Sequence, residues 1–193
     1  MEKVPTPQSP EQEKELVVAN LLKSISEQDV QEILDIDKQI FPSMPVEEEE
    51  IRETLESEGV QVVLKDAKSK IVGYIISLPH EDAYEFLSEI DPNIENQVGG
   101  IYVESIGILP EHRSLKNFNQ LWSTFAAEAQ RKGFKKITAH VRVSEGLSAV
   151  LQKRFGAVKF RTYDNWADFN EPFDYLEMEL GASSTSVPDS NAR

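Results

Sequence analysis

Residues 101–156, IYVESIGILPEHRSLKNFNQLWSTFAAEAQRKGFKKITAHVRVSEGLSAVLQKRFG, decide the fold of this chain. The pattern predicts a strand, a turn led by Pro110, a long amphipathic helix, a second strand, and a shorter helix that ends at Gly156. Residues 101–161 hold 11 Lys/Arg against 4 Asp/Glu, whereas the whole chain has a net charge of −14. A basic segment where a strand passes into a helix predicts a binding site for an anionic ligand.

The long helix of this stretch, expected from about 114 to 132, carries one buried face. Its apolar side chains recur at helical spacing, at Phe118, Leu121, Trp122, Phe125, Ala126 and Ala129. Gly133 is expected to end this helix, and Ser144 to cap the shorter one.

The segments on either side of this stretch predict further strands and helices. Ser26 followed by Asp29 resembles a capping box, which opens a helix that Pro42 stops. A polar insertion at 80–99 contains a short helical patch, Tyr84–Ile90. The other elements expected are a helix at 46–57 and strands at 15–23, 61–66, 70–79, 157–163 and 174–180.

Composition limits the class of protein. A chain of 193 residues with 39% hydrophobic content predicts one domain, residues 13–181, between disordered segments at 1–12 and 182–193. There is no apolar run of 18 residues, no Cys, and only three dispersed His, so neither a membrane span nor a metal site is expected. The N-terminus lacks the apolar core of a secretory signal, which predicts a cytoplasmic location. The acidity argues against nucleic acid as a partner, and a monomer or a homodimer is expected.

The predicted order, β-α-α-β-β-β-α-β-α-β-β over about 15–181, resembles the GNAT superfamily of acyl-CoA-dependent N-acyltransferases. Three segments carry the resemblance: YVESIGILPEHR at 102–113, KKITAHVRVSEGLSAVLQKRFGA at 135–157, and DYLEMEL at 174–180. The resemblance implies an α+β fold of three layers, in which helices flank a mixed, mostly antiparallel central sheet. It also implies acetyl-CoA as co-substrate and a primary amine as acceptor.

The resemblance places the cofactor between the strand at 101–109 and the strand at 135–141. It assigns cofactor contacts to Ile106, Ile108, Arg113, Ser114, Lys116, Asn117 and Phe118. The family's loop usually reads Q/R-x-x-G-x-G/A, and its glycines let the backbone approach the pyrophosphate closely. Here Lys116 and Phe118 replace those glycines. Lys116 is a candidate phosphate contact, and Phe118 is a candidate core residue on the helical stripe.

Glu104 is the candidate catalytic base. It alternates with Tyr102, Ile106 and Ile108 on one face of its strand, so desolvation is expected to raise its pKa and suit it to deprotonating an ammonium. An ion-paired structural carboxylate is the alternative. His112 and His140 are expected to be an exposed turn residue and a structural residue.

At the position of the general acid, this sequence differs from the usual pattern of the family. The position where many members carry a Tyr general acid is Gln152, which cannot donate a proton at useful pH. Acidic segments at 27–37, 47–58 and 81–95 are candidates for an electronegative mouth that attracts a cationic small-molecule or peptide amine. The run Glu47–Glu50 is read first as the solvated first turn of its helix, and a docking surface for a cationic partner is the alternative. The alternative to an enzyme is a GNAT-like module that binds a ligand or a protein without turnover.

Overall fold

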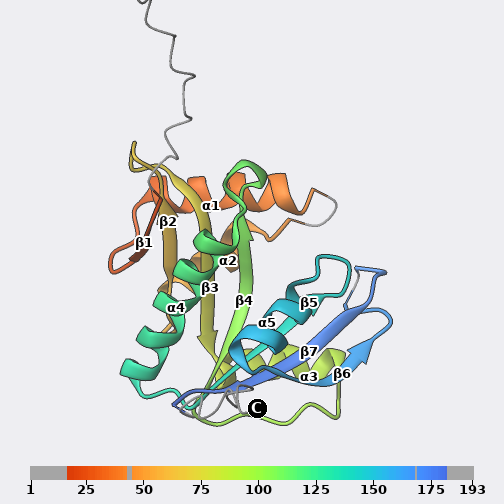
Figure 1. The fold of residues 1–193 in the computed structure, drawn as a ribbon. Coiled ribbons are helices and arrows are strands. Elements are labelled where there is room, and N and C mark those ends of the chain that lie inside the picture. The colour runs from red at the N-terminus through yellow and green to blue at the C-terminus, as the bar shows by residue number, and fades with distance from the viewer. Residues whose placement is uncertain (1–16, 43–44, 168, 182–193) are drawn as a thin grey trace, which may run out of the picture.

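The computed structural model describes residues 17–42, 45–167 and 169–181, shown as a ribbon in Figure 1. Its elements follow one another as β1 (Val18–Leu21), α1 (Glu27–Ile40), α2 (Glu48–Glu56), β2 (Val62–Lys65), β3 (Ile71–Pro79), α3 (His80–Ile90), β4 (Gly100–Ile108), η1 (Pro110–His112), α4 (Leu115–Lys132), β5 (Lys136–Arg142), α5 (Leu147–Phe155), β6 (Val158–Tyr163) and β7 (Phe173–Glu179). The segments expected to be disordered, 1–12 and 182–193, lie outside the described residues.

The strands form one sheet in the order β1-β2-β3-β4-β5-β7-β6. All neighbouring strands are antiparallel except β4 and β5, which are parallel. Because parallel neighbours need a crossover connection, α4 passes over one face of the sheet between β4 and β5. The mixed, mostly antiparallel sheet predicted from the sequence is confirmed.

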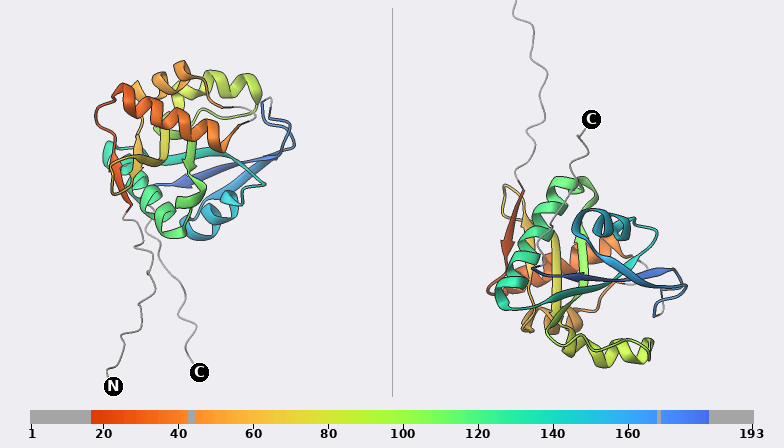
Figure 2. Two further views of the ribbon diagram at one scale, coloured as in Figure 1. Left: turned by 90° about the horizontal axis from the view of Figure 1, so that it is seen from above. Right: turned by 60° about the horizontal axis from the view of Figure 1, so that its bottom comes forward.

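Helices cover both faces of the sheet. Figure 2 (left) shows α1 and α3 on one side and α4 and α5 on the other. The interior between these layers contains the largest fully buried side chains, among them Trp122 and Phe125 of α4, Tyr74 of β3 and Ile33 of α1. The apolar stripe read from the sequence of the long helix is therefore the face that α4 packs on the sheet.

Several helix ends form as predicted. The side-chain oxygen of Ser26 accepts from the N–H of Asp29 at 3.2 Å, and the Asp29 carboxylate accepts from the N–H of Ser26 at 3.1 Å, which completes the capping box. Gly133 ends α4 with a φ of 98° and Gly156 ends α5 with a φ of 71°, a backbone conformation that favours glycine. The prediction that Ser144 caps α5 is wrong, because Gly146 holds the N-cap position and the Ser144 hydroxyl bonds Glu171.

The segment between β3 and β4 departs most from the predicted order. The short helical patch expected there is a full helix, α3, which begins four residues earlier at His80. Ala83 and Leu87 form its buried face, so packing against the sheet extends a helix that its polar composition conceals. Of the strand expected at 15–23, the residues up to 16 lie outside the described part of the chain, and in the described part the strand spans Val18–Leu21.

Within the described part of the chain, no helix is both long and apolar enough to cross a membrane.

Candidate active site

The parallel strands β4 and β5 pair over only part of their length. Their register runs from Gly100 with Lys136 to Val103 with Ala139 and stops there. Both strands continue beyond this point, β4 to Ile108 and β5 to Arg142, each still paired with its other neighbour. A gap therefore opens in the middle of the sheet, with unpaired backbone on both of its sides.

Glu104 lies where the two strands separate. In the pairing of β3 with β4, Ile76 faces Ser105 and Ser77 faces Val103, so Glu104 is an extra residue with no partner. Such a β-bulge bends the strand and re-aims its side chains, which is a common device next to active sites. The simple alternation predicted for this strand is thus interrupted at Glu104, although Tyr102, Glu104, Ile106 and Ile108 all line the same cavity.

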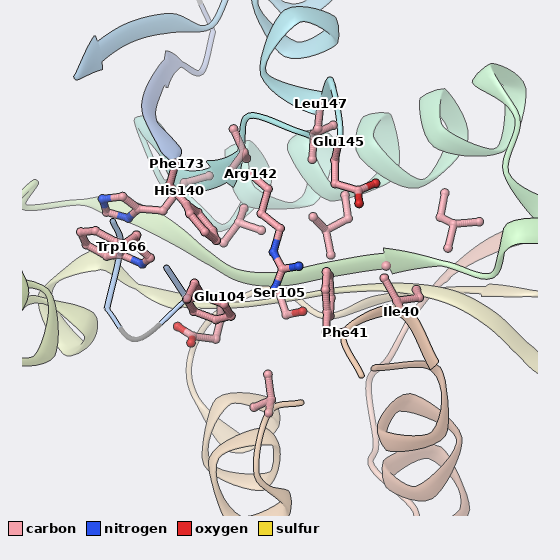
Figure 3. A pocket seen from close by; sticks show the side chains of 18 of the residues that line it. Ile40, Phe41, Glu104, Ser105, His140, Arg142, Glu145, Leu147, Trp166 and Phe173 are labelled. Carbon is pink, nitrogen blue, oxygen red and sulfur yellow. The ribbon is translucent and has the colours of Figure 1, made fainter. Parts of the chain in front are cut away.

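This cavity has a volume of about 750 Å³ and is lined by residues from most of the layers. Its walls come from α1 and the following segment, α2, α3, β4, the turn before α4, β5, α5 and the connection between β6 and β7. Figure 3 shows Glu104 and Trp166 at one end, Glu145 and Leu147 on the opposite side, and Arg142 between them. The cavity therefore extends through the gap between β4 and β5.

The carboxyl group of Glu104 is held in an unusual state. Desolvation by burial, reinforced by the nearby carboxylate of Glu50 on α2, raises its pKa to about 8. A group with this pKa exchanges a proton easily near neutral pH, as a general base must. Glu50, predicted to belong to a solvated first turn or a docking surface, also lines the cavity.

Beyond Val103 the main chain of β4 turns hydrogen-bonding groups toward the gap instead of toward β5. Leu109 donates its N–H to the Val72 carbonyl at 3.0 Å, on the β3 side. Because these groups alternate along an antiparallel strand, those of Ile108 and Ile106 face the opposite side, where β5 has diverged. Arg113 confirms this direction for Ile108, since its Nε donates to the Ile108 carbonyl at 2.9 Å.

The start of α4 lies at the other side of the cavity. The Ser114 hydroxyl accepts from the N–H of Asn117 at 3.1 Å, and the Asn117 side-chain amide donates to the His112 carbonyl at 2.8 Å. Arg113, Ser114 and Phe118 line the cavity, whereas Lys116 and Asn117 do not. Five of the seven cofactor residues predicted from the sequence are thus brought together around it.

The two side chains that replace the family's glycines point in different directions. Phe118 stacks on Trp122 with ring centroids 5.9 Å apart and meets Phe155 edge-on at 6.0 Å. It therefore packs on the core, as predicted from its place on the apolar stripe of the helix. Lys116 is exposed to solvent. Ser114 and Leu115 at the start of α4 also line the cavity, so the positive end of the helix dipole lies at the cavity wall.

Arg142 joins two walls of the cavity. Its guanidinium lies over the rings of Phe41, Phe169 and Phe173 at 4.7, 5.0 and 5.8 Å, and it forms an ion pair with Glu171 at 3.1 Å. Phe41 ends α1, while the other three residues belong to the connection into β7 or to its start. These cation–π contacts tie the segment after α1 to the loop before β7.

His140 lines the same cavity but is not suited to act as a base. Its ring stacks on Trp166 with centroids 3.5 Å apart, and its Nδ1 lies 3.2 Å from the Tyr102 hydroxyl. Burial lowers the pKa of His140 to about 3, so the imidazole is neutral and weakly basic. This agrees with the structural role expected from the sequence.

The position of the family's general acid is outside the cavity. The amide of Gln152 donates to the Ser148 hydroxyl at 2.9 Å, and Gln152 is exposed on α5. Sequence reasoning did not identify Glu50, Arg142, Phe41 or Trp166 as site residues. They come from separate elements, and no spacing in the sequence indicates that they meet.

The mixed sheet, whose parallel strands β4 and β5 pair only as far as Val103, has the α+β architecture that the resemblance to acyl-CoA-dependent acyltransferases implies. A family model described as the acetyltransferase (GNAT) family matches residues 28–156. That match covers about two thirds of the 193 residues, and the chain belongs to the GNAT family of acetyltransferases. The predicted class of enzyme, an acyl-CoA-dependent N-acetyltransferase, is thereby confirmed.

Solved structures with the same fold are distant in sequence. The ribosomal-protein-S18-alanine N-acetyltransferase from Escherichia coli is 13% identical with a TM-score of 0.63, over 92% of this chain and 99% of that one. The NatC complex bound to Gag peptide and CoA is 15% identical with a TM-score of 0.65, over 85% and 98%. An aminoglycoside 6′-N-acetyltransferase complexed with coenzyme A is 11% identical with a TM-score of 0.63, over 84% and 97%. A comparison with curated proteins found no match.

Proposed function

We propose that this protein transfers an acetyl group from acetyl-CoA to a primary amine by direct attack, with Glu104 as the base. The observation that carries the proposal is the position of Glu104 at a β-bulge where β4 and β5 separate, with the pKa of its carboxyl group raised to about 8. Solved neighbours bound to CoA support acetyl-CoA as the co-substrate.

The residues of the cavity divide between the two substrates. The main-chain groups of Ile106 and the N–H of Ile108, which are turned toward the gap, suit the amide-containing arm of acetyl-CoA. The N-terminal end of α4 and the guanidinium of Arg113 supply positive charge for its phosphates. The opposite end, around Glu104 and Glu50, remains for the amine.

In the reaction, Glu104 takes a proton from the substrate ammonium, directly or through water. The neutral nitrogen then attacks the thioester carbonyl carbon, a C–N bond forms, the C–S bond breaks to release the CoA thiolate, and the nitrogen loses its second proton to water. Because Gln152 is exposed and carries no acidic proton, the thiolate takes its proton from water. The chain has no Cys, so a thiol acyl-enzyme does not form.

Calorimetric titration with acetyl-CoA at low and moderate salt tests this proposal. We expect micromolar binding that weakens with salt, and a loss of about 5- to 10-fold in affinity in Arg113→Ala. Arg131→Ala is the matched control, because Arg131 pairs with Glu128 at the far end of α4. Absence of binding, also with longer acyl-CoAs, would favour the module without turnover.

A further inference from the structure

The helix α3 shapes the acceptor end of the cavity. Its buried residues Ala83 and Leu87 belong to a second apolar cluster with Tyr102 and Trp166, two aromatic residues that line the cavity. The chain after α3 is fixed as well, because the Asp91 carboxylate accepts from Arg161 and Tyr163 of β6, both at 2.6 Å. Packing and hydrogen bonds therefore hold α3 in place as one wall of the cavity. The predicted order of elements contained no helix at this position.

Phe86 is the residue that α3 presents to the cavity. It follows Ala83 by three positions, so it lies along the edge of the buried face of the helix. Its side chain is among the large apolar groups left exposed, at 48%, and it lines the cavity. An exposed ring at the wall of a cavity offers apolar surface that a bound molecule can remove from water.

The charges of the cavity do not fit a polyvalent cation. From the acidic segment 81–95, expected to build an electronegative mouth, Phe86 reaches the cavity and no carboxylate does. Arg142 places a guanidinium group, paired with Glu171, in the middle of the cavity. Glu145, the third lining carboxylate, forms an ion pair with Arg113 at 3.9 Å, so the carboxyl groups of Glu50 and Glu104 remain for a single ammonium. The lining also includes six aromatic side chains from separate elements: Phe41, Phe86, Tyr102, Trp166, Phe169 and Phe173.

We propose that the acceptor is a primary ammonium carrying a flat apolar substituent, and that Phe86 determines this specificity. This inference rests on the proposed function and names its substrate class. The ammonium lies at Glu104 and Glu50, and the substituent lies against Phe86 and the other rings. A free arylalkylamine and the first residue of a peptide with an aromatic side chain share this chemistry.

Acetyl transfer to matched amines tests the proposal. The free-amine arm compares 2-phenylethylamine with ethylamine, and the peptide arm compares peptides that begin with Phe and with Ser. We expect the apolar member to have a kcat/KM roughly 30- to 100-fold higher in at least one arm. In Phe86→Ala, KM for that acceptor should rise by about 3- to 10-fold, with kcat little changed. Phe160→Ala is the control, because Phe160 is an exposed ring on β6 outside the cavity.

Binding of 2-phenylethylamine and of the Phe peptide, followed by tryptophan fluorescence with CoA present, separates this inference from the proposed function. Saturable binding that Phe86→Ala weakens and Phe160→Ala does not would support the inference even if no acetyl group were transferred. Turnover that is equal for the two members of both pairs, or identical in the two variants, would overturn it while leaving the acetyltransferase activity intact. Absence of binding by both apolar ligands would overturn it too.

Discussion

Replacing Glu104 with Gln tests both the chemistry and the electrostatics of the site. The substitution keeps the size of the side chain and removes its ability to take a proton. We expect kcat to fall by about 10²- to 10⁴-fold while acetyl-CoA still binds, because Glu104 lies apart from the start of α4. In the wild type, a pKa of about 8 means that roughly one tenth of the protein holds the basic form at pH 7. The kcat of the wild type should therefore rise about 10-fold between pH 7 and pH 9.

The same carboxyl group makes the stability of the protein depend on pH. Its pKa is 4.5 ordinarily and about 8 in the fold, so between these values the native state binds more protons than the unfolded state. The free energy of unfolding of the wild type thus falls as pH rises through this interval. At about 1.4 kcal/mol per pH unit, the loss at pH 7 relative to the fully protonated protein is about 3 kcal/mol.

Glu104→Gln removes this loss, so its unfolding free energy should vary less between pH 5 and pH 8. Urea unfolding at pH 5, 6, 7 and 8 measures both slopes. Glu53→Gln is the control, since Glu53 is exposed on α2 and does not line the cavity. Equal slopes in the wild type and in Glu104→Gln would refute a raised pKa at Glu104, and an unchanged kcat would refute its role as the base.

Two further substitutions probe the surroundings of the site. Glu50→Gln removes the neighbouring negative charge, so the pKa of Glu104 should fall and the rising limb of the pH–rate profile should move to lower pH. A limb that stays in place would show that burial alone raises the pKa of Glu104. Asp37→Ala should cost about 3 kcal/mol in urea unfolding, because it leaves the Tyr74 hydroxyl and the Val46 N–H, now 2.6 and 2.7 Å from the carboxylate, without their acceptor. Asp35→Ala, on the exposed side of α1, should cost far less, and equal losses would contradict this account.

Short sequence patterns were sufficient to predict most of the helices and strands. The capping box at Ser26, the apolar stripe of α4 and the glycines at its end and at the end of α5 depend on neighbours within one or two turns of chain. The start of α3 was missed because its first turn is polar in sequence, and the burial of His80 and Ala83 there is seen only in the tertiary structure. Ser144 was misjudged as a cap because its hydroxyl has a competing partner, Glu171, from a distant loop.

The sequence by itself determined the class of fold, the strand that carries Glu104 and the basic turn that begins α4. These follow from periodicity and from the order of short motifs, which are properties of contiguous chain. Only the tertiary structure decided that Glu50 approaches Glu104, that Arg142 bridges two loops, and that Phe86 lines the cavity. Each of these depends on where separate elements pack, and the pKa of Glu104 depends on the burial and the neighbouring charge that this packing creates.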